Sequence, residues 1–345
     1  MSLKEAGIVH KKTDEILIAS IHFRREYKDI LLKFRELFNV CGDYVCGSPI
    51  AVYDYGVYTD GVDIEACFPV TQAVHTDEVT SRMLESVEVL SLIHGGPYEN
   101  VRESYQKLYS YFRDHGIVAT NLGREIYLEF NPENFENNVT ELQAVLHKWD
   151  DRLAKNVERV LGEEAREKVM KERDTFTLES TIDERAQWVT NAMERLDELT
   201  NDTQKYAILS ECAHDFSEKR IADLKAVYEQ TGDIDEVLKA MRKDPGWYEN
   251  PIRKGNTIYV KKILFNKEGY EKATTEIEKK KNYCHCSLIK DYLDEISPTF
   301  CYCGSGWYRQ QWEGILGKPV KIEILKSLTK GDCTCEMAIH LPENV

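Results

Sequence analysis

The chain has 345 residues, which is too long for one typical hydrophobic core and indicates two or three domains. Its hydrophobic content of 42% is enough to bury cores and argues against a disordered chain. A formal net charge of −15 disfavours direct binding of nucleic acid and would attract cationic ligands.

The amino-terminal stretch lacks the features of a signal peptide. Residues Met1 to Lys12 contain neither an apolar core region nor a cleavage site of small residues. No apolar run elsewhere is long enough to cross a bilayer, so we expect a cytoplasmic protein without a membrane partner. In such a compartment the ten cysteines are expected to be reduced thiols, metal ligands or redox pairs rather than a disulfide framework.

Two segments of the first half repeat the same pattern. An apolar run typical of a strand, Ile16 to Ile21 or Val87 to Ile93, leads through a polar turn to a tyrosine, Tyr27 or Tyr98. From each tyrosine, apolar residues recur at the spacing of an amphipathic helix that ends near Phe38 or Phe112. We interpret most of these helix aromatics as core residues.

Each predicted helix is followed by a pair of predicted strands. In the first copy these cover residues 48–58 and 61–70, and in the second copy residues 123–132 and 138–146. The copies align when Tyr53 is placed against Tyr127 and Glu65 against Glu141. The pattern predicts an α+β fold in which two strand-helix-strand-strand units form one antiparallel sheet with both helices on one face.

Alternation along the strands then assigns side chains to faces. Ile64, Ala66 and Phe68 point to one side of the strand, which we expect to be the helix side. Glu65 points to the other side, as Glu141 does in the second copy. Both glutamates are therefore expected on the uncovered face. Tyr53 and Tyr55 are expected to share one face of their strand. Glu125, Tyr127 and Glu129 are likewise expected to share one face of theirs.

Residues Ile16 to Leu146 resemble the GyrI-like proteins and the effector-binding domains of AraC-type and MerR-type regulators. The residues that carry the likeness are "HGGPYENVRESYQKLYSYF", "REIYLEFNP" and "VTELQAVL", with "SPIAVYDYG" and "VDIEACFPV" as their first-half counterparts. The resemblance implies a groove that binds small, often cationic and aromatic compounds, lined by aromatic side chains with a buried glutamate. The matching positions and their strand neighbours make up the predicted ligand-binding set: Tyr53, Tyr55, Glu65, Glu125, Tyr127 and Glu141.

Two functions remain open at this point. Regulators with this domain usually carry a DNA-binding domain before it, whereas here the repeat starts near Ile16, which predicts a small-molecule effector-binding protein without its own DNA-binding domain. Some stand-alone relatives are hydrolases of reactive electrophiles, and in that alternative Glu141 or Glu65 would act as the general base. The same carboxylate serves both functions, and neither the ligand nor the oligomeric state follows from the sequence.

The second half of the chain is expected to be mainly helical until about residue 250 and rich in cysteine thereafter. Three C-x-C pairs lie in the last 62 residues, which suggests a site for zinc or an iron–sulfur cluster, a redox pair, or ordinary buried thiols. The predicted metal ligands are Cys284, Cys286, Cys301, Cys303, Cys333 and Cys335.

The carboxyl-terminal tail is predicted to form a hairpin around Lys330, Gly331 and Asp332. With the segment "FCYCGSGWYRQQWEGILG" before it, the tail resembles the ends of vinyl-reductase-type and amino-thiazoline-carboxylate-hydrolase-like domains. The resulting plan has a small-molecule-binding domain at 1–148, a helical region at 149–250 and a cysteine-rich α/β domain at 251–345. The last two are either separate or packed as one domain.

Overall fold

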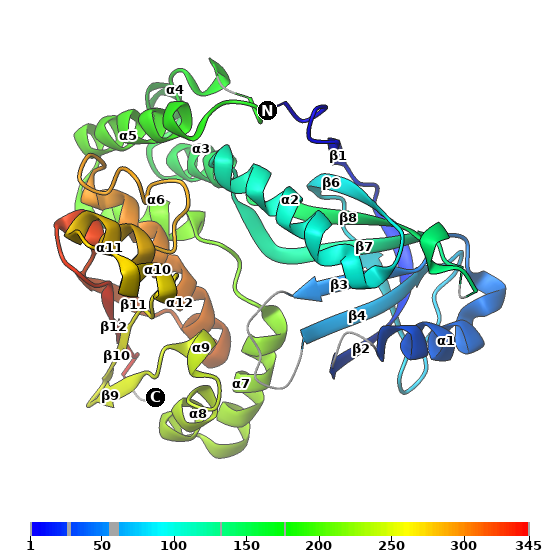
Figure 1. Ribbon diagram of the computed structural model, residues 1–345. Helices are drawn as coiled ribbons and strands as arrows, with labels where there is room; N and C mark the ends of the chain where they lie inside the picture. Colours follow the sequence, from blue (N-terminus) through cyan, green and yellow to red (C-terminus); the bar gives the residue numbers. More distant parts are fainter. Residues whose placement is uncertain (1, 26–28, 55–61, 132, 176, 344–345) are drawn as a thin grey trace. The chain divides into compact units, whose positions relative to one another are not determined.

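The computed structural model describes residues 2–25, 29–54, 62–131, 133–175 and 177–343 (Figure 1). The chain divides into two compact units, Met1–His147 and Lys148–Val345. The first is called the sheet unit and the second the helical unit, and each is described by itself. Within the described residues, no helix combines the length and apolar character needed to span a membrane.

The sheet unit contains one eight-stranded antiparallel sheet among its described residues, in the order β1-β6-β8-β7-β3-β4-β2-β5. Its strands are β1 (Ile8–Lys12), β2 (Ile16–Arg25), β3 (Ile50–Asp54), β4 (Val62–Pro69), β5 (Thr80–Leu84), β6 (Glu88–Gly95), β7 (Ala119–Glu129) and β8 (Val139–Leu146). Its helices are α1 (Ile30–Cys41) and α2 (Val101–Asp114).

The predicted duplication is confirmed by this strand order. The first copy is β2-α1-β3-β4 and the second is β6-α2-β7-β8, and the two copies join through β3 and β7 in the middle of the sheet. In that central pair Ile50 lies opposite Ile126 and Tyr53 opposite Gly123. The outermost strands β1 and β5 were not predicted, and Tyr27, the predicted start of the first helix, lies outside the described residues.

Helix α1 packs on one face of this sheet because its apolar residues recur at helical spacing. Ile30, Phe34, Leu37 and Cys41 are buried against a sheet surface that includes Ala51, Ile64, Ala66 and Phe68. The buried residues of α2 are Leu108, Tyr111 and Phe112, at the same kind of spacing. We call the face that contacts these helices the helix-covered face.

The opposite, helix-free face is closed by two links of the chain. The link from β1 to β2 and the link from β5 to β6 run side by side, since Thr13 donates its amide to Val87 O and Ser86 Oγ donates to Thr13 O. The Arg124 guanidinium, which points to this face from β7, donates to Thr13 Oγ1 and to Glu85 O. Below the links lies a small second core of Ile18, Ile50, Cys67 and Leu84.

The strand registers place Glu65 and Glu141 on this helix-free face. Glu65 accepts hydrogen bonds from Arg82 of β5, at 2.9 Å for Arg82 Nε, and lies 3.3 Å from His22 Nε2. Glu141 forms an ion pair with Lys11 of β1, at 2.6 Å. Burial by itself would raise the pKa of Glu65, but the hydrogen bonds from His22 and Arg82 outweigh it and lower that pKa to about 2.

The helical unit has α3 (Trp149–Leu161), α4 (Glu163–Val169), α5 (Ile182–Leu199), α6 (Asp202–Leu209), α7 (Glu218–Thr231), α8 (Ile234–Met241), α9 (Pro245–Tyr248), α10 (Lys267–Lys272), α11 (Glu276–Tyr283) and α12 (Tyr302–Leu316). A sheet of β9 (Ile252–Lys254), β10 (Thr257–Lys261), β11 (Lys321–Lys326) and β12 (Glu336–His340) has the order β11-β12-β10-β9. The predicted hairpin is the antiparallel pair of β11 and β12.

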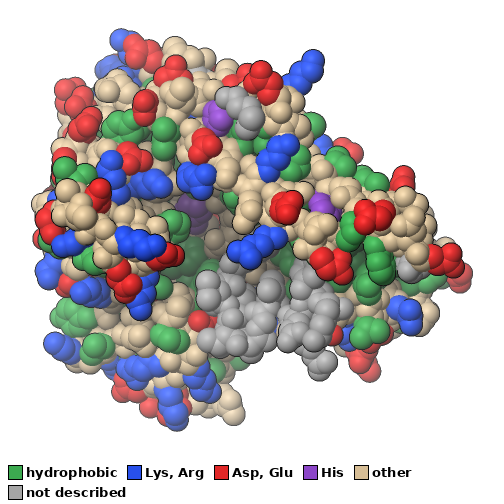
Figure 2. All heavy atoms as spheres, viewed as in Figure 1, with side chains coloured by type: hydrophobic (Ala, Val, Ile, Leu, Met, Phe, Trp, Pro, Cys, Tyr) green, Lys and Arg blue, Asp and Glu red, His purple; other side chains and the backbone are tan. Residues whose placement is uncertain are grey.

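The sequence explains several boundaries in the helical unit. Helix α5 begins with a capping box, in which Thr181 and Glu184 exchange side-chain to backbone hydrogen bonds. Helix α7 ends at Gly232, which has the left-handed conformation that favours glycine. The many charged residues of these helices lie at the surface, where acidic and basic side chains intermingle (Figure 2).

Gly306 allows α12 to approach the short 3₁₀ turn Ser210–Cys212 closely. A Cβ atom at position 306 would lie 1.8 Å from the Ser210 carbonyl oxygen and 2.8 Å from Ala213 Cβ. At Gly304 of the same helix, a Cβ atom would meet only Met337 Cε, at an ordinary 3.5 Å. The close contact between α12 and the turn therefore requires a residue without a side chain at position 306.

We predict that Gly306→Ala destabilises the helical unit by about 3 kcal/mol, because backbone atoms must move to admit the methyl group. Gly304→Ala is the matched control and should be neutral or stabilising by up to about 1 kcal/mol through helix propensity. All five tryptophans follow residue 147, so tryptophan fluorescence during urea denaturation reports on this unit. Equal stability of the two variants would contradict the close approach.

We also predict that Glu65→Gln destabilises the sheet unit by roughly 2 kcal/mol at pH 7, through loss of charge-assisted hydrogen bonds. A carboxylate whose pKa is lowered on folding, here from 4.5 to about 2, adds stability above about pH 4.5 and loses it as the pH falls toward 2. The difference between Glu65→Gln and the unchanged protein should therefore shrink over that range. Urea denaturation followed by circular dichroism measures it, with the exposed Glu78→Gln as control.

Candidate ligand-binding site

Glu125 is a buried carboxylate on the helix-covered face of β7, with 1% of its surface exposed. Among the residues that the structure describes, four tyrosine hydroxyls donate to it. Tyr98 Oη lies 2.5 Å, Tyr127 Oη 2.9 Å and Tyr53 Oη 3.0 Å from Glu125 Oε2, and Tyr105 Oη lies 2.6 Å from Glu125 Oε1. We call Glu125 with these tyrosines the tyrosine site.

Three kinds of element hold the four tyrosines in place. Tyr53 and Tyr127 stand on neighbouring central strands, and their hydroxyl oxygens are 3.3 Å apart. Tyr98 lies in the 3₁₀ turn Tyr98–Asn100 that precedes α2, and Tyr105 lies in the first half of α2. Because seven residues are about two helical turns, Tyr98 and Tyr105 lie on the same side of the helical segment.

Aromatic rings surround this carboxylate on the helix-covered face. Phe34 of α1 packs edge-on against Tyr127, with ring centroids 5.3 Å apart, and Tyr98 stacks on Tyr127 at 6.3 Å. Tyr105 stacks on Tyr109 at 6.1 Å, and burial raises the pKa of Tyr109 to about 12. The rings of Tyr105 and Tyr109 therefore extend the apolar surroundings of the Glu125 carboxylate along α2.

This arrangement can recognise a positive charge. Hydroxyl donors satisfy a buried carboxylate without adding positive charge, and hydrogen bonds to a carboxylate are stronger than those between neutral groups. Tyrosine rings add cation–π attraction for an organic cation near their faces. The tyrosine site thus combines a buried negative charge with aromatic faces.

The structure brings together only part of the predicted ligand-binding set. Tyr53, Glu125 and Tyr127 meet in the tyrosine site, whereas Glu65 and Glu141 lie on the helix-free face with partners of their own. Tyr55 lies outside the described residues. The sequence comparison aligned Glu141 with Glu65 but could not show which face of the sheet carries the tyrosines.

Two features of the tyrosine site were missed from sequence. Tyr98 and Tyr105 were interpreted as helix core residues, although their spacing of seven could have indicated a common polar partner. A bulge in β7 between Tyr127 and Glu129 also shifts the register against β8, so that Glu129 pairs with Val139. The expected common face of Glu125, Tyr127 and Glu129 is therefore interrupted after Tyr127.

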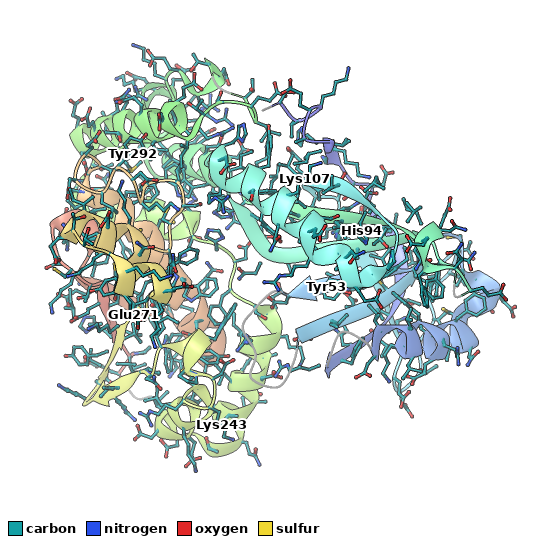
Figure 3. All side chains as sticks on the ribbon, in the orientation of Figure 1. Tyr53, His94, Lys107, Lys243, Glu271 and Tyr292 are labelled. Carbon is teal, nitrogen blue, oxygen red and sulfur yellow. The ribbon has the colours of Figure 1, made fainter. Side chains whose placement is uncertain are left out.

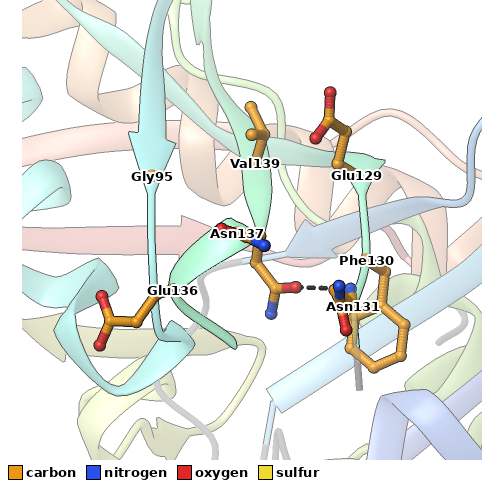
Figure 4. Close-up of a pocket in the computed structure, with 8 residues that line it drawn as sticks. Gly95, Glu129, Phe130, Asn131, Glu136, Asn137 and Val139 are labelled. Carbon is orange, nitrogen blue, oxygen red and sulfur yellow. Dashed lines mark hydrogen bonds between the residues drawn. The ribbon is translucent and has the colours of Figure 1, made fainter. Parts of the chain in front are cut away.

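An open pocket of about 470 Å³ lies where β6, β7 and β8 end (Figure 4). Its lining is polar and includes two carboxylates and three asparagines. The lining residues are Gly95, Glu129, Phe130, Asn131, Glu136, Asn137, Asn138 and Val139. This lining shares no residue with the predicted ligand-binding set.

The metal site predicted at the cysteines of the helical unit stays a prediction. Among the described residues, no group of three or more histidine, cysteine, aspartate or glutamate side chains is placed to hold a metal ion. The C-x-C pairs also lie outside strands. Cys284 and Cys286 follow α11, Cys301 and Cys303 are at the start of α12, and Cys333 and Cys335 precede β12.

These thiols differ in their exposure and in their hydrogen-bond partners. Cys301 Sγ lies 3.1 Å from Thr329 Oγ1, whereas Cys333 is exposed. Burial raises the pKa of Cys286 and of Cys335 to about 11 each, which keeps both thiols protonated near neutral pH. Four of the six cysteines that were expected to be ligands, Cys284, Cys286, Cys303 and Cys335, pack against the same core of the helical unit.

Two parts of the chain match known protein families. Residues 47–145 match the GyrI-like small molecule binding domain family. Residues 259–345 match a family of unknown function, DUF6144, so the resemblance of this end to vinyl-reductase-type domains is not confirmed. No curated protein matches the chain.

Several solved structures are similar to the sheet unit at low sequence identity. The carboxyl-terminal domain of EcmrR is 21% identical, with 41% of this chain and 97% of that domain covered and a TM-score of 0.37. A structure of SAV2435 bound to tetraphenylphosphonium is 9% identical, with 42% and 96% covered and a TM-score of 0.33. A hydrolase from Listeria innocua is 13% identical, with 41% and 92% covered and a TM-score of 0.33.

The chain spans 56% of the EcmrR chain in a complex with DNA, at 20% identity and a TM-score of 0.37. The family match covers the strands that carry Tyr53, Glu125 and Tyr127 as well as the turn and helix that carry Tyr98 and Tyr105. The duplicated sheet with its helix-covered face agrees with that match. Residues 47–145 of this chain therefore form a GyrI-like small molecule binding domain.

Proposed function

We propose that the sheet unit binds a hydrophobic organic cation at the tyrosine site, with Glu125 as the counter-charge. The observation that supports this function is the buried Glu125 carboxylate with its tyrosine hydroxyl donors (Tyr53 is labelled in Figure 3). A protein that only required a stable core would gain more from an apolar side chain at position 125, because a buried charge is costly to desolvate.

Charge and aromatic surface together favour this class of ligand. Cation–π contacts contribute roughly 0.5–2 kcal/mol each, and burial of an apolar ligand body adds about 25 cal/mol for each Å² removed from water. The acidic balance of the chain, −15, raises the local concentration of cations around it. A carboxylate alone would bind many cations weakly, whereas the rings select those with an apolar body.

The hydrolase alternative has less support in the arrangement of the side chains. Its proposed base, Glu141, forms an ion pair with Lys11 and lies on the face opposite to the tyrosines. A general base must lie within hydrogen-bond reach of the proton that it abstracts. We therefore propose a binding protein and not a hydrolase. That it is cytoplasmic remains a prediction.

We predict that Glu125→Gln lowers the affinity for tetraphenylphosphonium at least about tenfold, because the counter-charge is lost while the side-chain shape is kept. Titration calorimetry of the full chain measures the affinity. The thermal midpoint of the sheet unit should change little, because removing a buried charge offsets weaker hydrogen bonds from the tyrosines.

Glu141→Gln is the matched control, since it removes the same charge from the helix-free face. It should leave the affinity within about twofold of the unchanged protein. If Glu141→Gln abolished binding and Glu125→Gln did not, the binding face would be the helix-free one. An unchanged protein that does not bind tetraphenylphosphonium or rhodamine 6G would contradict the proposed ligand class.

A further inference from the structure

His94 is a buried histidine next to the end of β6, with 5% of its surface exposed. It lies opposite Thr140 in the strand pair β6–β8, and its neighbour Ile93 lies opposite Glu141. Because Glu141 is on the helix-free face, His94 points to the helix-covered face below α2 (Figure 3). The imidazole is therefore on the same side of the sheet as the tyrosine site.

Both ring nitrogens of His94 have partners in the segment that carries two of the site's tyrosines. His94 Nε2 lies 3.1 Å from Pro97 O, and His94 Nδ1 lies 3.0 Å from Ser104 Oγ. Pro97 immediately precedes Tyr98, and Ser104 immediately precedes Tyr105. One imidazole thus links the end of a strand to the two backbone positions from which Tyr98 and Tyr105 reach Glu125.

The partners also define which nitrogen carries the proton. A carbonyl oxygen can only accept, so His94 Nε2 must donate to Pro97 O. In the neutral ring His94 Nδ1 then accepts the Ser104 hydroxyl proton. One neutral tautomer is therefore able to make both contacts.

The turn that His94 contacts joins the end of β6 to the segment that carries Tyr98. It contains Gly96, which has a φ of +97°, a region open mainly to glycine. Gly96 donates its amide to Asn138 O, which attaches the turn to β8. Tyr53 and Tyr127, in contrast, are fixed by the ladders of central strands. The two tyrosines after the glycine turn therefore depend on further contacts for their position.

We propose that His94 is a positioning residue of the tyrosine site, which holds Tyr98 and Tyr105 at the distance from which their hydroxyls reach Glu125. This inference rests on the proposed function of the tyrosine site, and it adds a residue that touches neither Glu125 nor its ligand directly. Losing the histidine should release the turn and the start of α2 while leaving the strand tyrosines where they are.

The test uses the full chain with tetraphenylphosphonium as the probe. His94→Leu removes both contacts and should weaken binding about tenfold, whereas His94→Gln, whose amide can still donate to Pro97 O, should recover at least about a third of the affinity. His115→Leu is the matched control, because His115 is also buried and bonded, to Tyr111 O, but lies at the other end of α2. It should leave the affinity within about twofold.

A double-mutant cycle separates positioning from a general loss of stability. If His94 acts through the two tyrosines, His94→Leu should change the affinity by less than about twofold in a protein that already carries Tyr98→Phe and Tyr105→Phe. A tenfold effect that persists in that background would overturn the proposal. So would an equal loss of affinity in His115→Leu.

A measurement without ligand keeps this test independent of the proposed function. In NMR spectra of protein with labelled tyrosine rings, His94→Leu should shift the signals of Tyr98 and Tyr105 but leave that of Tyr53 nearly unchanged. Unchanged Tyr98 and Tyr105 signals would overturn the positioning role even if Glu125→Gln abolished binding. Conversely, shifted signals in a protein that does not bind the probe would contradict the proposed function alone.

Discussion

The sheet unit is organised around one costly interaction, the burial of the Glu125 carboxylate. A charge removed from water must be compensated, and here hydroxyl groups from a strand of the first copy and from a strand, a turn and a helix of the second copy supply the compensation. The site therefore exists only when β3 and β7 are paired and α2 is in place. Duplication of a small module created the sheet, and the contact between copies created the site.

The two faces of the sheet use acidic residues in different ways. On the helix-free face Glu65 and Glu141 have cationic partners of the chain itself, Arg82 and Lys11, so their charges stabilise the strands that carry those cations. On the helix-covered face Glu125 is held by hydroxyl groups among aromatic rings. A carboxylate among neutral donors and rings is suited to the organic cation that we propose as its ligand.

Several cysteines of the helical unit pack against its hydrophobic core. Cys286 and Cys335 lie beside a hydrophobic core, and burial raises the pKa of each thiol to about 11. A thiol that is protonated near neutral pH packs as a small apolar side chain. The C-x-C pairs are in turns and at a helix start rather than in strands, and Cys284 and Cys286 pack against the same core.

The sequence by itself determined the duplicated sheet and the two covering helices, because hydrophobic periodicity and turn chemistry are local properties of the chain. The family resemblance rested on the likeness of particular segments, and the match of residues 47–145 agrees with it. The sequence also identified Tyr53, Glu125 and Tyr127 as candidates for the same ligand site. Only the tertiary structure decided that Glu125 is the central carboxylate and that Tyr98 and Tyr105 belong to it. The reason is that the identity of a site depends on which faces and copies meet, and strand alternation leaves the choice of face open until the helices and crossing links are placed.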